Sequence, residues 1–351
     1  MVTISLCLIV KNEEENLFSF LEYIQHFVDE IILVDTGSTD KTITIATSFG
    51  CRVFSFDLTE KGLADARNFS LEQATKEWIL VLDPDERIAP RDLEKIRQLT
   101  EQQEYIGFYL IQRNYTANKG GYIDWVSSQG DKYEESAIAP GWSPNPIIRF
   151  FKNDRRIRFE GFCHEVVDKN IEKIGKVGEL PIPIHHYGIL NREKYGKAER
   201  NITLLRKDLE QGTKETYFTY FQLAVTLLDK DDLKGAESAL QKSIEHNPQY
   251  APALSRLACL CLLKNNSSEA EELLLRALKV EPSADIYNNL GVLFARKKEY
   301  QRAVNYFREA TVLSPKNSDS YVNLSLLFEE VGEKKKAEFF LGKAKELNPS
   351  I

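Results

Sequence analysis

The stretch WILVLDPDERI, from Trp78 to Ile88, joins an apolar run to a cluster of acids. Ile79 to Leu82 has the apolar character of a buried strand. Asp83, Asp85 and Glu86 follow at once, with a proline between the first two. Taken alone, the segment is typical of a solvated turn after a strand. The alternative is a set of ligands for a cation and its phosphates, and the surrounding sequence distinguishes the two.

The sequence before and after this stretch alternates between strand-like and helix-like patterns. Short runs rich in β-branched and aromatic residues predict strands at 4–10, 31–37, 52–56, 78–83, 107–113 and 147–151. Apolar residues at helical spacing, or a closing glycine, predict helices at 12–28, 39–49 and 64–75. This alternation predicts an α/β domain over residues 1–190, with a mostly parallel sheet and helices on its faces.

Three of the predicted strands end in polar segments, KNEEEN (11–16), DTGSTD (35–40) and DPDER (83–87). Ligands of open α/β sheets bind beyond the carboxyl ends of the strands. The chain has no G-x-G-x-x-G segment and no Walker lysine loop, so the usual dinucleotide and ATP sites are not supported. Carboxylates bind phosphates through a hard divalent cation such as Mg²⁺ or Mn²⁺. The acids therefore favour a cation site over a solvated turn.

The rest of the chain is repetitive. Prolines 248, 282, 315 and 349 are spaced by 34, 33 and 34 residues, and a leucine recurs at 223, 257, 290 and 324. Small residues recur in each unit, which lets two helices of a hairpin approach closely. The pattern resembles tetratricopeptide repeats and predicts four of them over 217–351, forming an all-α superhelix. A charged segment at 191–216 predicts a connecting helix.

Composition excludes several classes of partner. The net charge of −7 argues against nucleic acid or an anionic membrane surface, since both bind basic proteins. No apolar run is long enough for a transmembrane segment. The five cysteines are odd in number and lie mostly in apolar runs, which is typical of reduced thiols in a cytoplasmic protein.

Five segments together resemble family-two nucleotide-sugar glycosyltransferases with a GT-A fold and C-terminal tetratricopeptide repeats. The segments are SLCLIVKNEEENL (5–17), DEIILVDTGSTDKT (29–42), ADARNFSLEQATKEWILVLDPDE (64–86), RFEGFCHEVV (158–167) and HYG (186–188). The broad group includes bacterial enzymes that glycosylate peptides. The resemblance implies a Rossmann-like GT-A domain, a nucleotide-sugar donor and a divalent cation, Mn²⁺ or Mg²⁺.

The resemblance also implies individual roles. Asp83 and Asp85 match the D-x-D motif, in which the second acid binds the metal and the first lies near the ribose or the metal. The residues that match the nucleotide-sugar-binding positions are Asn12, Glu13, Asp35, Arg67 and Asp83. The alternative for Asp35 is an acid at the N-terminus of the next helix, and the alternative for Arg67 is pairing with a surface acid.

Two later residues complete the predicted site. Glu165 matches an acceptor-side acid, which an inverting transfer needs as a general base, although it could instead control the conformation of its loop. His186 matches a histidine that contacts metal or phosphate, and hydrogen bonding within the domain is its alternative. We therefore predict Glu165 and Asp85 as catalytic residues, and Asp85, Asp83 and His186 as metal ligands.

Two regions are candidates for binding the acceptor. Residues 114–145 interrupt the strand pattern and contain Trp125 and Trp142, so they predict either a lid over the sugar site or an excursion with its own small core. In the repeats, Gln222, Asn289 and Asn323 precede the recurring leucine and could bind an extended peptide. Alternatively, the repeats pair two copies of the chain or brace the first domain.

The sequence therefore predicts a metal-dependent, inverting glycosyltransferase. Its donor would be a nucleotide-diphosphate sugar, a UDP-sugar by resemblance, and its acceptor a peptide, protein or glycan. One rival hypothesis is an inactive nucleotide-binding scaffold that acts through its repeats. Another is a nucleotidyltransferase, which usually needs a glycine-rich and basic loop where this chain has VKNEEEN (10–16).

Overall fold

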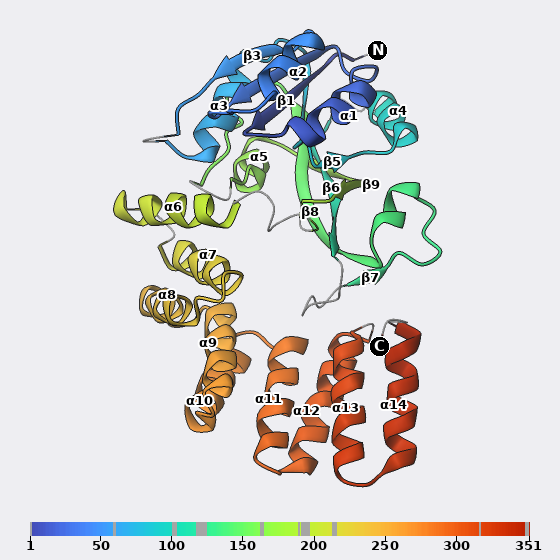
Figure 1. Ribbon diagram of the computed structural model, residues 1–351, viewed down its shortest axis with the longest axis vertical. Helices are drawn as coiled ribbons and strands as arrows, with labels where there is room; N and C mark the ends of the chain where they lie inside the picture. The colour runs from blue at the N-terminus through green and yellow to red at the C-terminus, as the bar shows by residue number, and fades with distance from the viewer. Residues whose placement is uncertain are drawn as a thin grey trace. The chain divides into compact units, whose positions relative to one another are not determined.

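The computed structural model describes residues 2–58, 61–99, 104–116, 125–161, 165–188, 190, 197–212, 216–315, 317–347 and 351. Its chain divides into two compact units (Figure 1). The first unit comprises 1–118 and 128–195, and the second comprises 119–127 and 196–351.

A mixed sheet forms the centre of the first unit. Its strands run in the order β3 (Arg52–Ser55), β2 (Glu30–Asp35), β1 (Ile4–Val10), β4 (Trp78–Val81), β8 (Gly141–Lys152), β6 (Gly107–Thr116), β9 (Val177–His186), β5 (Glu86–Arg87). The first four strands are mutually parallel. β8 pairs antiparallel with both β4 and β6, and β9 is parallel to β6. The parallel half confirms the predicted α/β class.

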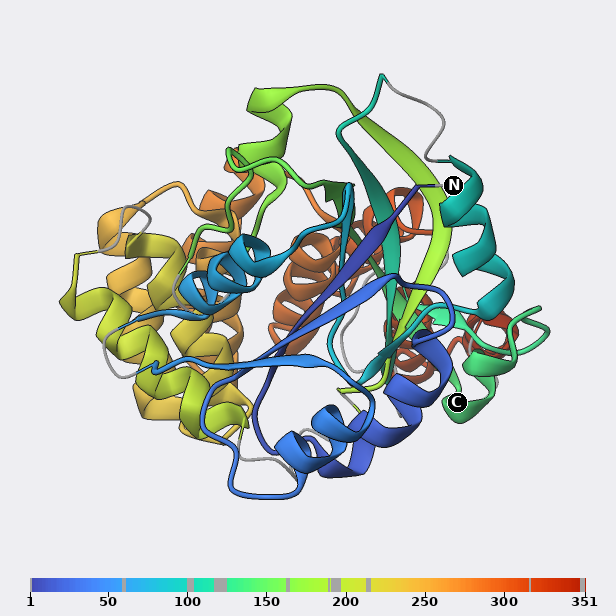
Figure 2. The ribbon, with the colours of Figure 1, turned by 90° about the horizontal axis from the view of Figure 1, so that it is seen from above.

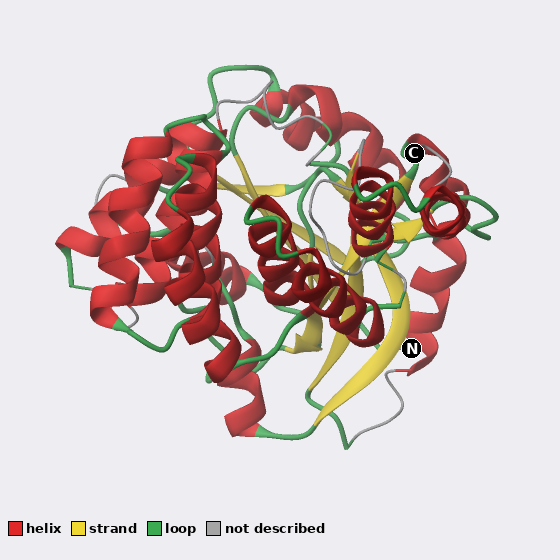
Figure 3. Ribbon diagram, turned by 90° about the horizontal axis from the view of Figure 1, so that it is seen from below, coloured by secondary structure: helices red, strands yellow, loops and turns green. Residues whose placement is uncertain are grey.

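Helices cover both faces of this sheet. Alternate residues of a strand point to opposite faces, so Leu6 and Leu8 of β1 face one core and Cys7 faces another. The first core receives side chains from α1 (Glu14–Ile24), α2 (Thr42–Ser48) and α4 (Pro90–Leu99). The second receives them from α3 (Leu63–Gln73) and α5 (Asp168–Ile174). Figure 2 shows the blue and teal helices beside the strands, and Figure 3 distinguishes helices from strands by colour.

The strands extend further than the sequence predicted in the region around 114–145. β6 continues to Thr116 and β8 begins at Gly141, whereas the sequence predicted a strand only from residue 147. Pro144 and Pro146 lie inside β8. Prolines cannot donate to a ladder and usually mark the ends of strands, which concealed the first half of β8. Between the two strands lie β7 (Val126–Ser127) and a 3₁₀ helix at Glu134–Ile138; residues 117–124 lie outside the described part.

The second unit begins with α6 (Lys197–Glu210) and continues in antiparallel helix pairs. The pairs are α7 (Thr216–Leu228) with α8 (Leu233–His246), α9 (Ala251–Leu263) with α10 (Ser267–Val280), α11 (Ala284–Arg296) with α12 (Tyr300–Leu313), and α13 (Ser318–Glu330) with α14 (Lys334–Leu347). They confirm the predicted repeats. α6 covers much of the predicted connecting helix, of which 191–196 and 213–215 lie outside the described residues. Among the described helices, none combines the length and the apolar composition needed to cross a membrane.

Small residues bring the two helices of each repeat together. Ala236, Ala270 and Ala303 are fully buried on the second helices. Gly291 on α11 faces Phe307 of α12, and a Cβ added there would overlap the ring, with Cζ only 2.8 Å away. The third repeat therefore requires glycine at this position.

Gly291→Ala should lower the free energy of unfolding of the repeat unit by about 1–3 kcal/mol, because the added methyl displaces the buried ring of Phe307. Chemical denaturation followed by far-ultraviolet circular dichroism measures the change. Gly342→Ala on exposed α14 is the matched control, since a Cβ there meets nothing within 4 Å. It should be neutral or stabilise by up to about 1 kcal/mol. Equal stability of the two variants would contradict the packing argument.

Candidate active site

Two predicted site residues, Asn12 and Glu13, join the loops after β1 and β2, and a third, Asp35, bonds within its own loop. Thr39 donates its backbone N–H to Asn12 Oδ1 at 2.8 Å, and Ser38 donates to Asp35 Oδ1 at 3.1 Å. Glu13 donates its own N–H to Thr42 Oγ1 at 2.8 Å. The Asp35 carboxylate thus accepts from the N–H groups of Gly37 and Ser38 in its own loop, before α2 begins. These contacts fix the shape of the loops at the carboxyl ends of the parallel strands.

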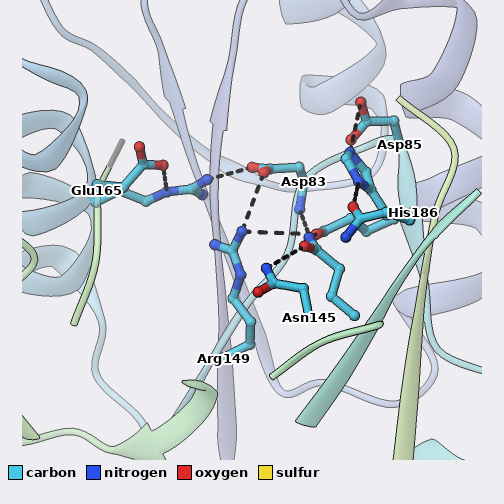
Figure 4. Close-up of polar contacts among 10 residues, drawn as sticks. Asp83, Asp85, Asn145, Arg149, Glu165 and His186 are labelled. Carbon is cyan, nitrogen blue, oxygen red and sulfur yellow. Dashed lines mark hydrogen bonds and ion pairs between the residues drawn. The ribbon is translucent and has the colours of Figure 1, made fainter. Parts of the chain in front are cut away.

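Asp83 lies between two arginines immediately after β4 (Figure 4). Arg67 Nη2 donates to Asp83 Oδ1 at 2.6 Å, and Arg149 Nη2 lies 3.7 Å from Asp83 Oδ2. Burial alone would raise the pKa of Asp83, but Arg67 and Arg149 outweigh it and hold that pKa below its ordinary value. Asp83 is therefore a stable anion with an arginine at each carboxylate oxygen.

Arg67, predicted as a nucleotide contact, is 1% exposed and bridges two acids. Besides Asp83, its Nε donates to Glu165 Oε1 at 3.0 Å. Burial lowers the pKa of Arg67, but the two carboxylates outweigh it and raise the pKa. The structure thus brings Arg67 into contact with Asp83, 16 positions away in the chain, and with Glu165, 98 positions away.

Asp85 and His186 meet on the other side of Asp83 (Figure 4). His186 Nε2 lies 3.8 Å from Asp85 Oδ2, and the Asp85 side chain is 10% exposed. His186 Nδ1 lies 2.7 Å from Asn114 Oδ1, and its other ring nitrogen, Nε2, faces Asp85. A Cβ added at Gly188 would overlap Asp85 Oδ2 and lie 2.7 Å from His186 Nε2. Glycine therefore leaves space between a carboxylate oxygen and an imidazole nitrogen.

A buried polar network, which the sequence did not reveal, supports the acidic turn. Glu86 is fully buried and accepts from the backbone N–H of Asp83 at 2.9 Å and from Gln112 Nε2 at 2.6 Å. Asn145 in turn donates to Gln112 Oε1 at 3.1 Å. Burial raises the pKa of Glu86. Polar residues within the apolar runs of β6 and β8 were the available signal for Gln112 and Arg149.

The region between β6 and β8 carries its own small core. Trp142 packs with Tyr115 and Ala139, and Trp125 is 5% exposed. Tyr115 also shares a hydrogen bond of 2.7 Å with Nδ1 of the buried His185, whose pKa burial lowers to about 3. This arrangement matches the alternative of an excursion with its own core. The two tryptophans contribute buried surface rather than an exposed wall.

Gln222, Asn289 and Asn323, the repeat residues predicted to bind a peptide, form a polar row of partly buried side chains. Asn289 Nδ2 donates to Ser255 Oγ at 3.3 Å, and Asn323 Nδ2 donates to Asn288 Oδ1 at 3.3 Å. Each bond joins the first helices of neighbouring repeats. Gln222 occupies the corresponding position on α7.

Comparison with known proteins identifies the family. A family model described as glycosyl transferase family 2 matches residues 5–160. An uncharacterized glycosyltransferase of Rickettsia felis is 31% identical over 229 residues, which cover 62% of this chain and 74% of the relative. The chain belongs to glycosyl transferase family 2. It is therefore a glycosyltransferase, and the inactive scaffold is set aside.

Two longer matches include the repeats of this glycosyltransferase. A TPR repeat-containing protein of Synechococcus elongatus is 28% identical over 333 residues, or 90% of this chain and 76% of the relative. The SPbeta prophage-derived glycosyltransferase SunS of Bacillus subtilis is 26% identical over 329 residues, or 89% and 67%. Tetratricopeptide-repeat models match 219–250, 257–318 and 318–351 of the glycosyltransferase.

Proposed function

We propose that this glycosyltransferase transfers a sugar, with inversion, from a UDP-sugar to a peptide, protein or glycan, and that it depends on Mn²⁺ or Mg²⁺. The observation that carries the proposal is the division of the acids around Asp83. Asp85 and His186 lie together on one side, and Glu165 lies on the other, joined to Asp83 by Arg67. A donor-side cation site and an acceptor-side base require such a separation.

The donor side fits a divalent cation. Asp85 Oδ2 and His186 Nε2 face each other across the space that Gly188 leaves. Asn114 bonds to Nδ1 and fixes the His186 ring, as the hydrogen-bond partners of metal-bound histidines commonly do. Among the described residues, no group of three or more His, Cys, Asp or Glu side chains could hold a metal. Asp85 and His186 would thus bind the cation together with substrate phosphates and water, which is usual for Mg²⁺.

When bound, a divalent cation supplies positive charge next to the departing diphosphate. Asp83 would not share the cation, because arginines face both of its carboxylate oxygens. We assign it to the ribose side of the donor. Asn12, Glu13 and Asp35 would shape the nucleoside pocket: Asn12 and Glu13 join the loops after β1 and β2, and Asp35 orders the second of these loops.

Glu165 would act on the acceptor side. As a carboxylate, it would accept the proton of the acceptor's nucleophilic group while that group attacks the anomeric carbon. A direct displacement of this kind inverts the anomeric configuration. We assign the acceptor peptide to the polar row containing Asn289 and Asn323, since each amide has further donor and acceptor positions besides its bond to the neighbouring repeat. Pairing of two copies through the repeats stays a prediction.

A donor panel tests the proposal. The protein is incubated with Mn²⁺ or Mg²⁺, one of several nucleotide sugars and a mixture of acceptor peptides, and released nucleoside diphosphate is measured. We expect release from a UDP-sugar and none in the presence of a chelator. Unchanged release with the chelator would overturn the metal requirement. Formation of a nucleotide sugar and pyrophosphate from a sugar phosphate and a nucleoside triphosphate would instead favour a nucleotidyltransferase.

Gly188→Ala should raise the Mn²⁺ concentration for half-maximal transfer by at least about tenfold, because the methyl fills the space between Asp85 and His186. Titration of the transfer rate with Mn²⁺ measures the effect. Gly342→Ala, on an exposed helix of the repeats, is the control and should titrate like the wild type. An unchanged titration for Gly188→Ala would argue against the cation at this place.

A further inference from the structure

We propose that Arg67 is a positioning residue for transfer, which holds Glu165 and Asp83 in one fixed arrangement instead of contacting the nucleotide. The inference rests on the proposed role of Glu165 as the general base. Its basis is the guanidinium group, which is buried and already bonded to one acid from each side of the site.

The geometry leaves Arg67 little freedom to serve a ligand. Its Nε and Nη2 are engaged at 3.0 Å and 2.6 Å by Glu165 and Asp83. Its side chain is 2% exposed, whereas the side chains of Asp83 and Glu165 are 30% and 13% exposed. A substrate therefore reaches the acids more readily than the arginine. The third nitrogen of Arg67, Nη1, has no hydrogen-bond partner among the described residues, but it is buried and so does not face a substrate.

Asn68, which follows Arg67, bonds to Phe159 in the loop that carries Glu165. Asn68 Nδ2 donates to the carbonyl of Phe159 at 3.0 Å, and Asn68 Oδ1 accepts from the Phe159 N–H at 2.8 Å. Glu160 and Val166 then pair through two backbone hydrogen bonds of 2.8 and 2.9 Å. Helix α3 therefore bonds to this loop at two places. Asn68 bonds to Phe159, and Arg67 bonds to Glu165.

Charge makes this arrangement depend on the arginine. Arg67 forms its ion pairs with Asp83 and Glu165. Arg149 lies near Asp83 and Glu86, so Arg67 is the cation bonded to Glu165. An arginine can hold two carboxylates through different nitrogens of one rigid plane, whereas a lysine offers a single point charge. Lysine would keep the charge but lose the fixed geometry.

The test combines Arg67→Lys with Glu165→Gln in the full chain. Steady-state release of nucleoside diphosphate gives kcat and KM, and calorimetry with UDP and Mn²⁺ gives nucleotide affinity. We expect Arg67→Lys to lower kcat about a hundredfold, because misplaced catalytic groups cost roughly that much. KM for the donor and the Kd for UDP should change less than about threefold, because Arg149 still faces Asp83 on the donor side. In the Glu165→Gln background, Arg67→Lys should lower kcat by less than about threefold, because the base it positions is already absent.

Three outcomes would overturn the inference. A Kd for UDP raised more than about tenfold, with kcat retained, would make Arg67 a nucleotide contact. Independent effects of the two substitutions, multiplying in the double variant, would separate Arg67 from Glu165. A wild-type kcat in Arg67→Lys would also refute it. Wild-type kcat in Glu165→Gln would instead refute the proposed base itself, so the two failures are distinguishable.

Should Arg67→Lys fail to fold, Asn68→Ala provides a second measurement. It removes both hydrogen bonds to Phe159 and leaves every charge in place. Loosening the base of the loop should lower kcat about tenfold while the Kd for UDP stays unchanged. An unchanged kcat for a folded Asn68→Ala protein would count against positioning of Glu165 by α3.

Discussion

Asp85→Asn is expected to reduce sugar transfer about a thousandfold, while the protein remains folded. Asp85 Oδ2 faces His186 Nε2 across the space left by Gly188, so the substitution removes one of the two proposed protein ligands of the cation. Asparagine has nearly the same shape but no charge, and the diphosphate would depart with less electrostatic stabilisation. The measurement is kcat at saturating donor over a range of Mn²⁺ concentrations.

The control for this substitution is Asp154→Asn. Asp154 belongs to the same unit, pairs with the exposed Arg156 and lies outside the proposed site. The Asp154→Asn variant should transfer sugar at the wild-type rate. Thermal unfolding without metal should be nearly unchanged or slightly improved in Asp85→Asn. Retained transfer would refute the ligand role, and a protein that no longer folds would make the acid structural.

The strand pattern predicted the edge of the sheet at which the site lies, but not which acids its arginines contact. The carboxyl ends of β1, β2 and β4 could be expected to meet, because parallel neighbours in an α/β sheet share one edge. The resemblance supplied the D-x-D acids and Glu165. That Arg67 joins Asp83 to Glu165 depends on a loop 98 residues away, and no local pattern reports a contact of that range.

Adjacent histidines show what strand periodicity can and cannot reveal. Successive side chains of β9 point to opposite faces, so His185 and His186 must differ in environment. The resemblance favoured His186, which faces Asp85, while His185 is buried against Tyr115. Gln112 was not predicted, because its partners Glu86 and Asn145 are set by the register of strands far apart in sequence.

Glu165→Gln should lower kcat about a thousandfold, because the amide cannot accept the acceptor's proton and general-base catalysis contributes roughly that factor. KM for the donor should change little, since the substitution leaves Asp85, His186 and the loops after β1 and β2 in place. Glutamine also keeps a carbonyl oxygen that can accept from Arg67 Nε, so the loop retains a hydrogen bond where the carboxylate had one. The loss should therefore fall on the chemical step, and single-turnover kinetics with preloaded donor measures it directly.

Glu160→Gln is the matched control for this prediction. Glu160 lies in the same loop and pairs through its backbone with Val166, and its side chain is exposed. The same change of charge at this position should leave kcat within about twofold of the wild type, as is usual for exposed surface substitutions. Equal losses in the two variants would mean that the loop responds to its net charge. A loss confined to Glu165→Gln, with wild-type affinity for UDP, would locate the base at the one acid of this loop that Arg67 holds.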